Sequence, residues 1–380
     1  MRFEFIRTLR LLGAFASLLA VARPCFAGEA SSASSHESAT SIRGAIYIPA
    51  EAYNAPQLWR GFNVAETRRD FAYARKINLN ALRIWASYEY WQMEPERFKK
   101  SLDQLLEAAH ESGIRILISL FENCGVPPTP ENLWTTNPVT AFAINSPDKD
   151  ISLPQNREHW EKPREFVKWF MQNHRNDSRL LAIEVMNEPE PQFRANKPTM
   201  PFAKSMFQTA KSLKGSVALT VGTVSVEQAE QFIPLGLDVI EFHDNFPRDL
   251  QRFEKSLQHA VQVGEKHKLP VWLTEWQRLR PSGSGFGNET ITHDETLPDY
   301  ASLAATVQKY PVGNFFWSLM IKRAYLPSQR HKGTINGLFW PDGSAWSLAD
   351  ARAIARDPSL KLTENKTLPP GFLDFLGRSN

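Results

Sequence analysis

Short apolar runs alternate with amphipathic stretches along most of this 380-residue chain. The apolar runs cover residues 42–48, 81–86, 115–121, 180–186, 217–221, 238–242, 270–274 and 313–319. Segments between them carry apolar residues at helical spacing, and these include 66–77, 97–111, 164–173, 201–213, 250–267 and 298–308. Such alternation predicts a parallel sheet with crossover helices. Eight units match a closed (β/α)8 TIM barrel, so we expect a single α/β domain over residues 42–356.

An open, doubly wound sheet is the alternative architecture for this pattern. Proteins of that kind usually carry a glycine-rich phosphate-binding turn after the first strand. Here the first apolar run is followed by residues 49–54, Pro-Ala-Glu-Ala-Tyr-Asn, which contain no glycine. The sequence therefore favours the closed barrel.

Three long segments follow predicted strands. They cover residues 122–157 after the third strand, 276–297 after the seventh and 321–344 after the eighth. Segments in these positions gather at the carboxyl-terminal face of a barrel, where active sites lie. Long loops are usually functional, although inert decoration is the alternative for any one of them.

Residues 1–27 have the features of a signal peptide: basic residues, a short apolar stretch, and small residues before a cleavage site. These features are Arg2, Arg7 and Arg10, residues 11–21, and Ala27 before Gly28. A lipoprotein anchor at Cys25 is the alternative, but Arg23 and Pro24 are atypical of such a site. The apolar stretch is too short to span a membrane. We expect cleavage and a secreted or periplasmic product.

Two polar segments flank the predicted domain. Residues 28–41 are rich in serine and alanine and almost lack large apolar residues, which predicts a disordered linker. Residues 357–380 are polar and contain proline, and we expect them to form a C-terminal tail.

Removal of the leader changes the charge balance. It carries four arginines and one acidic residue, so the 44 basic and 41 acidic residues of the chain become 40 of each. No basic footprint for nucleic acid remains. Cys124 is then the only cysteine, which excludes an intrachain disulfide. We expect a monomer that uses no cofactor and no metal.

Glutamates end two of the predicted strands. Glu188 follows the fourth apolar run within the sequence Asn-Glu-Pro, and Glu275 follows the seventh. A buried charge is costly, so each carboxylate should be partnered, protonated or used in chemistry. The fourth and seventh strands lie on opposite sides of an eight-stranded ring, so both side chains can face each other across its mouth. One carboxylic acid and one carboxylate in this arrangement suit glycoside hydrolysis.

These features resemble glycoside hydrolase clan A, and most of all glycoside hydrolase family 5, whose fold is a (β/α)8 barrel. The clan is marked by an Asn-Glu pair at the end of the fourth strand and a lone glutamate at the end of the seventh. The resemblance covers most of residues 42–356. It implies that Glu188 is the acid/base, that Glu275 is the nucleophile, and that Asn187 binds the sugar 2-hydroxyl. It also implies retention of configuration through a covalent glycosyl-enzyme.

Three further residues match the family pattern and are candidate substrate-binding residues. Arg83 resembles the second-strand arginine that contacts the nucleophile, and a structural ion pair with Glu184 is the alternative. Trp317 resembles the eighth-strand tryptophan that supports the reactive sugar, and a core position is the alternative. His243 lies where the family has a histidine near the nucleophile.

The chain departs from the family at two strand ends. Relatives usually carry a tyrosine two residues after that histidine, where it hydrogen-bonds the nucleophile, whereas this chain has Asn245. Many relatives also have a histidine near the end of the third strand, where this chain has Glu122-Asn123-Cys124. We include Asn123 and Trp276 among the candidate substrate-binding residues because they lie at the predicted mouth. Other aromatic residues in or near the mouth loops are Tyr88, Tyr90, Trp91 and Trp134.

The expected function is that of a secreted retaining glycoside hydrolase acting on a β-linked oligo- or polysaccharide of the β-mannan or β-glucan type. An exo-acting β-glycosidase on oligosaccharides is the close alternative, because long loops can turn a cleft into a pocket. A non-catalytic sugar-binding relative would usually have lost a glutamate, and both are present. A metal-dependent barrel hydrolase would need His-x-His after the first strand, where Tyr47-Ile48-Pro49 stands.

Overall fold

The computed structural model describes residues 41–190, 199–279, 297–330, 332–370 and 372. The predicted signal peptide and residues 28–40 of the predicted linker lie outside these ranges, as does most of the predicted loop after the seventh strand. Export and cleavage therefore stay predictions.

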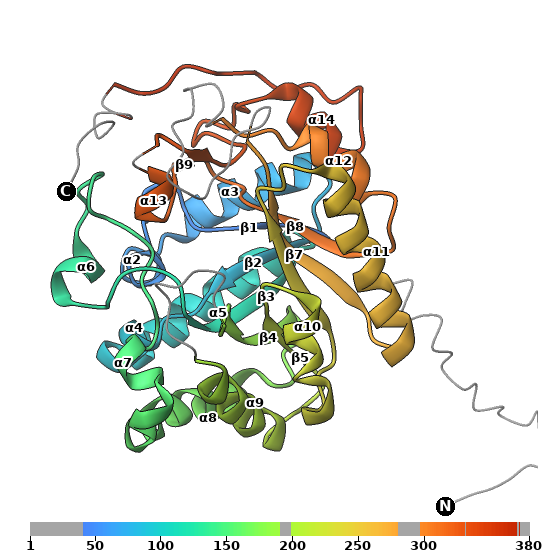
Figure 1. Ribbon diagram of the computed structural model, residues 1–380. Helices are drawn as coiled ribbons and strands as arrows, with labels where there is room; N and C mark the ends of the chain where they lie inside the picture. The colour runs from blue at the N-terminus through green and yellow to red at the C-terminus, as the bar shows by residue number, and fades with distance from the viewer. Residues whose placement is uncertain (1–40, 191–198, 280–296, 331, 371, 373–380) are drawn as a thin grey trace, which may run out of the picture.

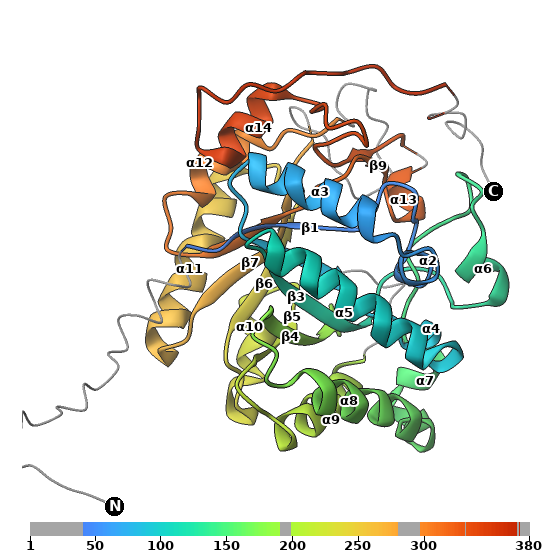
Figure 2. The same cartoon turned by 180° about the vertical axis from the view of Figure 1, so that it is seen from behind.

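Eight parallel strands form the centre of the molecule, and helices surround them (Figures 1 and 2). The strands are β1 (Arg43–Ile46), β2 (Ala81–Trp85), β3 (Arg115–Glu122), β4 (Leu180–Asn187), β5 (Ala218–Gly222), β6 (Ile240–Asn245), β7 (Val271–Gln277) and β8 (Gly313–Phe316). Hydrogen-bonded neighbours follow the order β5-β4-β3-β2-β1-β8-β7-β6. The N–H of His243 donates to the carbonyl of Thr223 at 2.9 Å, which joins the end of β6 to the chain just after β5. The predicted (β/α)8 barrel is confirmed.

The principal helices lie between the strands, mostly where apolar spacing predicts them. They are α3 (Val64–Lys76), α5 (Pro95–Glu111), α8 (Glu161–His174), α9 (Met200–Ser212), α10 (Val226–Glu230), α11 (Leu250–His267), α12 (Ala301–Val307) and α14 (Leu348–Ala355). Asn63 and Asp249 begin α3 and α11, because their side-chain oxygens accept hydrogen bonds from first-turn N–H groups. Within the described residues, no helix has both the length and the apolar character needed to cross a membrane.

The segments that follow the strands contain short elements of their own. They are α2 (Ala55–Arg60), α4 (Tyr88–Met93), α6 (Pro130–Trp134), α7 (Lys149–Ser152), α13 (Pro327–Arg330), the 3-10 helices η1 (Pro154–His159) and η2 (Ile233–Leu235), and the antiparallel pair β9 (Lys322–Arg323) and β10 (Ile335–Asn336). The long segments after β3 and β8 are therefore structured. In the tail, Phe372 is buried and its ring centroid lies 5.8 Å from that of Trp340.

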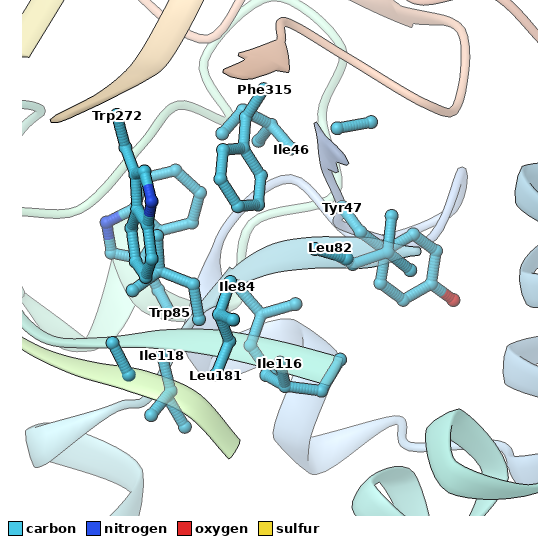
Figure 3. Close-up of a cluster of buried hydrophobic side chains, with 14 of the residues drawn as sticks. Ile46, Tyr47, Leu82, Ile84, Trp85, Ile116, Ile118, Leu181, Trp272 and Phe315 are labelled. Carbon is cyan, nitrogen blue, oxygen red and sulfur yellow. The ribbon is translucent and has the colours of Figure 1, made fainter. Parts of the chain in front are cut away.

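Apolar side chains from the strands pack together in the core. Figure 3 shows part of this cluster, with residues from β1, β2, β3, β4, β7 and β8: Ile46, Leu82, Ile84, Ile116, Ile118, Leu181, Trp272 and Phe315. Burying each such side chain contributes about 1.5–3 kcal/mol. Gly44 lies so close to the ring of Phe315 that a Cβ atom there would clash with it. This packing holds the strand ends that carry the polar residues described next.

Candidate active site

The predicted catalytic residues meet at the carboxyl ends of the strands. Asn187 is the last residue of β4, Glu188 follows it, and Glu275 lies near the end of β7. His243 is paired in register with Glu275 across β6 and β7. Arg83 reaches the same place from β2. The barrel thus brings together residues that lie far apart in the sequence.

Arg83 is fully buried and joins two of these residues, Asn187 and Glu275, to Glu184. Its Nε and Nη2 donate to the two carboxylate oxygens of Glu184, at 2.6 and 2.7 Å. Its Nη1 donates to Oε1 of Glu275 at 2.7 Å, and its Nη2 also donates to Oδ1 of Asn187 at 2.6 Å. The predicted contact with the nucleophile and the alternative ion pair therefore occur together. Gly222 leaves room for them, since a Cβ there would come within 2.7 Å of Oε1 of Glu184.

Glu275 is held by donors on both of its oxygens. Arg83 binds Oε1, and Nδ2 of Asn245 donates to Oε2 at 2.9 Å. Nε2 of Gln277 donates to Oδ1 of Asn245 at 3.1 Å, which keeps the amide nitrogen directed toward Glu275. Burial raises the pKa of Glu275, while the charges of His243 and Arg83 act in the opposite direction. Asn245 itself thus supplies the contact that relatives take from tyrosine.

Glu188 has an unusual backbone conformation and two side-chain partners. Its φ of 45° lies in the left-handed region, which costs a non-glycine residue on the order of 1 kcal/mol and is typical of functional sites. Nδ1 of His243 lies 2.7 Å from Oε1 of Glu188, and Sγ of Cys124 lies 3.0 Å from Oε2. Burial acts to raise the pKa of Glu188, but the hydrogen bond and charge of His243 outweigh it and lower that pKa.

His243 and Glu188 can share one proton. The 2.7 Å separation fits a protonated Glu188 that donates to Nδ1, and it also fits an Nδ1–H group that donates to the carboxylate. Nε2 of His243 has no hydrogen-bond partner among the described residues. A proton held in this pair is positioned for transfer, which general acid/base catalysis requires.

The two glutamates are close enough for one sugar ring to contact both. One atom each from Glu188, His243 and Glu275 lie within 4.8 Å of one another. Carboxyl groups about 5–5.5 Å apart are typical of retaining glycosidases. Three such atoms could also surround a cation, but Nη1 of Arg83 already places positive charge 2.7 Å from Glu275. The geometry therefore favours a catalytic carboxylate pair over a metal centre.

Glu122, the last residue of β3, is a third carboxyl group at this centre, and it is not among the predicted site residues. Nδ2 of Asn187 donates to both of its oxygens, at 2.8 and 2.9 Å, and the N–H of Cys124 donates to Oε1 at 2.6 Å. Burial raises the pKa of Glu122 to about 8. Because Glu122 and Arg83 occupy both polar ends of Asn187, the predicted contact of Asn187 with a sugar hydroxyl requires one of these bonds to be shared. The position of Glu122 at the end of an apolar run was a signal of the same kind as Glu188 and Glu275.

Asn123 is buried and contacts the backbone of Glu188. Its Nδ2 donates to the backbone carbonyl of Glu188 at 2.9 Å, and only 1% of the residue is exposed. Its contact is thus with the backbone that carries the acid/base candidate. Contact of Asn123 with substrate stays a prediction.

Trp276 does not lie at the mouth, which corrects the prediction that it binds substrate. Successive side chains of a strand point to opposite faces, so Glu275 faces the interior and Trp276 faces the surrounding helices. Its Nε1 donates to Oδ1 of Asn314 at 3.2 Å, and its ring packs against Tyr300 and Phe316. Only 2% of Trp276 is exposed.

Four other aromatic residues predicted in or near the mouth loops also lie away from the pocket. Tyr88 and Trp91 are buried against Phe166 of α8, so they belong to the packing between helices and barrel. Tyr90 is also buried, whereas Trp134 lies under the guanidinium group of Arg60. None of these four is among the residues that, with Glu122, line the pocket.

Trp317 lines the same pocket as Glu122, and its contact with a sugar stays a prediction. Its ring centroid is 5.8 Å from that of Trp85 and 5.2 Å from that of Tyr325, and both contacts are edge-on. The guanidinium carbon of Arg83 lies 4.6 Å from the centroid of Trp85. Trp85 thus contacts both the indole of Trp317 and the guanidinium group that holds Glu275.

No protein-family model and no curated protein matches the sequence. Solved structures do match. A GH5_18 protein from Streptomyces cattleya in complex with GlcNAc is 12% identical over 85% of this chain and 82% of its own, with a TM-score of 0.54. An endo-1,4-β-D-mannanase from Thermotoga petrophila RKU-1 is 15% identical over 83% and 98%, with a TM-score of 0.53. The exo-β-1,4-mannosidase Op5Man5 from Opitutaceae bacterium strain TAV5 is 15% identical over 83% and 58%, with a TM-score of 0.56.

At these identities the likeness establishes the fold. The chain has the (β/α)8 barrel of these glycoside hydrolases, and the resemblance to family 5 seen in the sequence is confirmed at that level.

Proposed function

We propose that this protein is a retaining glycoside hydrolase that cleaves a β-linked oligo- or polysaccharide of the β-mannan or β-glucan type. The observation that carries this proposal is the facing pair Glu188 and Glu275. Atoms of the two lie within 4.8 Å of one another, and each side chain is bound by its own set of donors. Barrels of similar fold with mannanase and exo-mannosidase activity support the substrate class.

In the first step, Glu275 attacks the anomeric carbon while Glu188 transfers its proton to the oxygen of the leaving sugar. The bond to Glu275 forms as the glycosidic bond breaks, which leaves a glycosyl-enzyme. Arg83 and Asn245 bind one carboxylate oxygen each, so they fix the orientation of Glu275 before attack. Preorganisation of this kind reduces the barrier without later rearrangement.

In the second step, Glu188 accepts a proton from the water that attacks the glycosyl-enzyme. The ester has by then removed the negative charge of Glu275, and loss of a nearby like charge lowers the pKa of Glu188. His243 Nδ1, 2.7 Å away, stabilises the carboxylate in this state. The same residue thus serves first as acid and then as base.

We further propose that the protein is exported. The support is the sequence of residues 1–27, with its basic start, apolar stretch and small-residue site. Polysaccharide substrates lie outside the cell, so export is consistent with the proposed activity.

The test is the configuration of the first product. Proton NMR of a digest of β-mannan and β-glucan oligosaccharides should show the β-anomer first, before mutarotation. The variant Glu188→Ala should lose far more activity on poor leaving groups than on activated aryl glycosides. Glu161→Ala, a change at an exposed glutamate of α8, is the matched control and should behave as the wild type. First appearance of the α-anomer would contradict retention.

A further inference from the structure

A pocket lies on the side of β1, β2 and β3, and its lining residue Glu122 is hydrogen-bonded to Asn187, which precedes Glu188. The lining also includes Tyr53, Glu89, Trp317 and Tyr325. We call it the end pocket. We propose that the end pocket receives the non-reducing-end sugar of a β-linked oligosaccharide, so that the enzyme is exo-acting; this rests on the proposed function.

Unpaired polar atoms of the lining are the first argument. Trp85 Nε1, Glu89 Oε1, Trp317 Nε1 and Tyr325 Oη are buried, and none has a hydrogen-bond partner among the described residues. Buried polar atoms are nearly always partnered, so four unpaired atoms around one pocket indicate a ligand with several donors and acceptors. The hydroxyl groups of a pyranose supply both.

Glu89 has a buried carboxylate oxygen that is available to bind a ligand. Only 7% of it is exposed, and its Oε2 accepts a hydrogen bond from Oγ of Ser146 at 2.7 Å, which leaves Oε1 unpaired. Burial raises the pKa of Glu89 to about 7. Near neutral pH its free oxygen can therefore either accept a hydrogen bond from a sugar hydroxyl or donate one to it. An uncharged sugar satisfies both forms.

Aromatic side chains form the apolar part of the walls. Trp85, Trp317 and Tyr325 are in mutual edge-on contact through Trp317. Aromatic side chains with a polar edge suit a ligand that has apolar C–H faces and polar rims. A pyranose ring has this character.

Hydrogen bonds between loops close this end of the groove. Nδ2 of Asn54, after β1, donates to the carbonyl of Phe142 in the loop after β3, at 3.3 Å. The N–H of Ala143 donates to the carbonyl of Tyr325, after β8, at 3.1 Å. Nη1 of Arg330 donates to the carbonyl of Pro138 at 3.2 Å. Loops from three strands are thus joined beside the end pocket, as a pocket that ends a cleft requires.

Two buried cations bind backbone carbonyls of these loops. Nζ of Lys322 donates to the carbonyls of Pro49 and Ala52, the latter at 2.6 Å, and Nε of Arg330 donates to the carbonyl of Ala324 at 2.9 Å. Lys322 thus ties the segment after β8 to the chain after β1.

The first experiment follows cleavage of β-1,4-linked mannohexaose and cellohexaose labelled at the reducing end. An exo-acting enzyme should shorten the labelled chain by one fixed increment from the earliest time points. Early labelled products of several lengths would show internal cleavage and overturn the proposal, while leaving the hydrolase function intact. Failure to cleave any β-glycoside would instead count against the proposed function.

The second experiment tests the pocket by binding and does not depend on turnover. Mannobiose and cellobiose are titrated into the protein while tryptophan fluorescence is followed. Tyr325→Phe removes only one unpaired hydroxyl, and Glu89→Gln changes the carboxyl with little change in size; each should weaken binding at least fivefold. Tyr73→Phe is the matched control, because its hydroxyl donates to the carbonyl of Pro341 instead. Equal affinity in all variants, or no binding to the wild type, would overturn the proposal.

Discussion

Nδ2 of Asn245 donates a hydrogen bond to Oε2 of Glu275 at 2.9 Å, and so replaces the tyrosine expected at this position. Asn245 is itself held by Nε2 of Gln277, at 3.1 Å. A short amide can take the role of a phenol here because β6 and β7 are direct neighbours, and each of the three residues lies on one of these two strands. The departure from the family pattern therefore leaves Glu275 with a donor on each oxygen.

We expect Asn245→Ala to lower kcat/KM about 10- to 100-fold. A hydrogen bond to a charged group is worth about 1.5–3 kcal/mol, and each 1.4 kcal/mol is a factor of ten in rate. Steady-state kinetics on an aryl β-glycoside measure the effect. Asn245→Asp should in addition raise the pKa of Glu275, so the acidic limb of the pH profile should move to higher pH. Wild-type kinetics for Asn245→Ala would show that the contact has no catalytic role.

We expect Arg83→Met to destabilise the protein by about 3–5 kcal/mol, because removal of one member of a buried ion pair leaves the other charge uncompensated. Glu184 and Glu275 would both lose their cation. Urea unfolding measures the loss. Arg68→Met is the control: Arg68 pairs with Glu111 at 3.0 Å, but about half of each side chain is exposed, so little stability should be lost. Similar losses in the two variants would contradict this account of Arg83.

We expect His243→Gln to move the basic limb of the kcat/KM profile to higher pH. His243 lowers the pKa of Glu188 through its hydrogen bond and its charge, whereas burial alone would raise that pKa. The acid must be protonated to act, so a higher pKa extends activity toward alkaline pH. A pH series that extends well below 4.5 is the measurement, because the pKa of Glu188 is lowered from that value, and an unchanged basic limb would contradict this effect of His243.

Glu89→Gln should change the pH dependence of stability. The pKa of Glu89 is raised from 4.5 to about 7 in the folded protein, so the native state binds this proton more tightly than the unfolded chain does. Its contribution to stability is present at low pH and is lost as the pH rises from about 4.5 through 7. Over that window the wild type should lose up to about 3 kcal/mol relative to the variant, at 1.36 kcal/mol per pKa unit. Thermal unfolding at pH 4.5, 6 and 7.5 measures this; parallel curves would refute it.

The barrel and its central pair of glutamates could be predicted because they leave local signals. The apolar spacing of each segment predicts whether it is a strand or a helix. Glu188 and Glu275 each follow an apolar run, where a charged residue is unexpected. Arg83 was predicted with two partners as alternatives, and the structure shows both. Charged residues within or at the end of apolar runs can be recognised in the sequence, because burying a charge is costly unless it is paired or used in chemistry.

The rest depends on strand ends and on contacts across the barrel. The seventh apolar run ends at residue 274, which predicts that Trp276 lies in a loop, but β7 continues to Gln277 and directs Trp276 outward. Glu122 ends β3 in the same manner as the other two glutamates, but no family motif marks it. The end pocket arises from hydrogen bonds between loops after β1, β3 and β8, and no local pattern encodes those.

The most direct test of the central claim is chemical rescue of Glu275→Ala with azide. If Glu275 is the nucleophile, the variant should not turn over an activated aryl β-glycoside. Added azide should restore turnover by attacking the anomeric carbon on the face opposite the leaving group. The product should then be the α-glycosyl azide, identified by NMR, whereas the wild type yields the β-sugar. Full activity of Glu275→Ala without azide, or a β-configured azide product, would contradict the assignment.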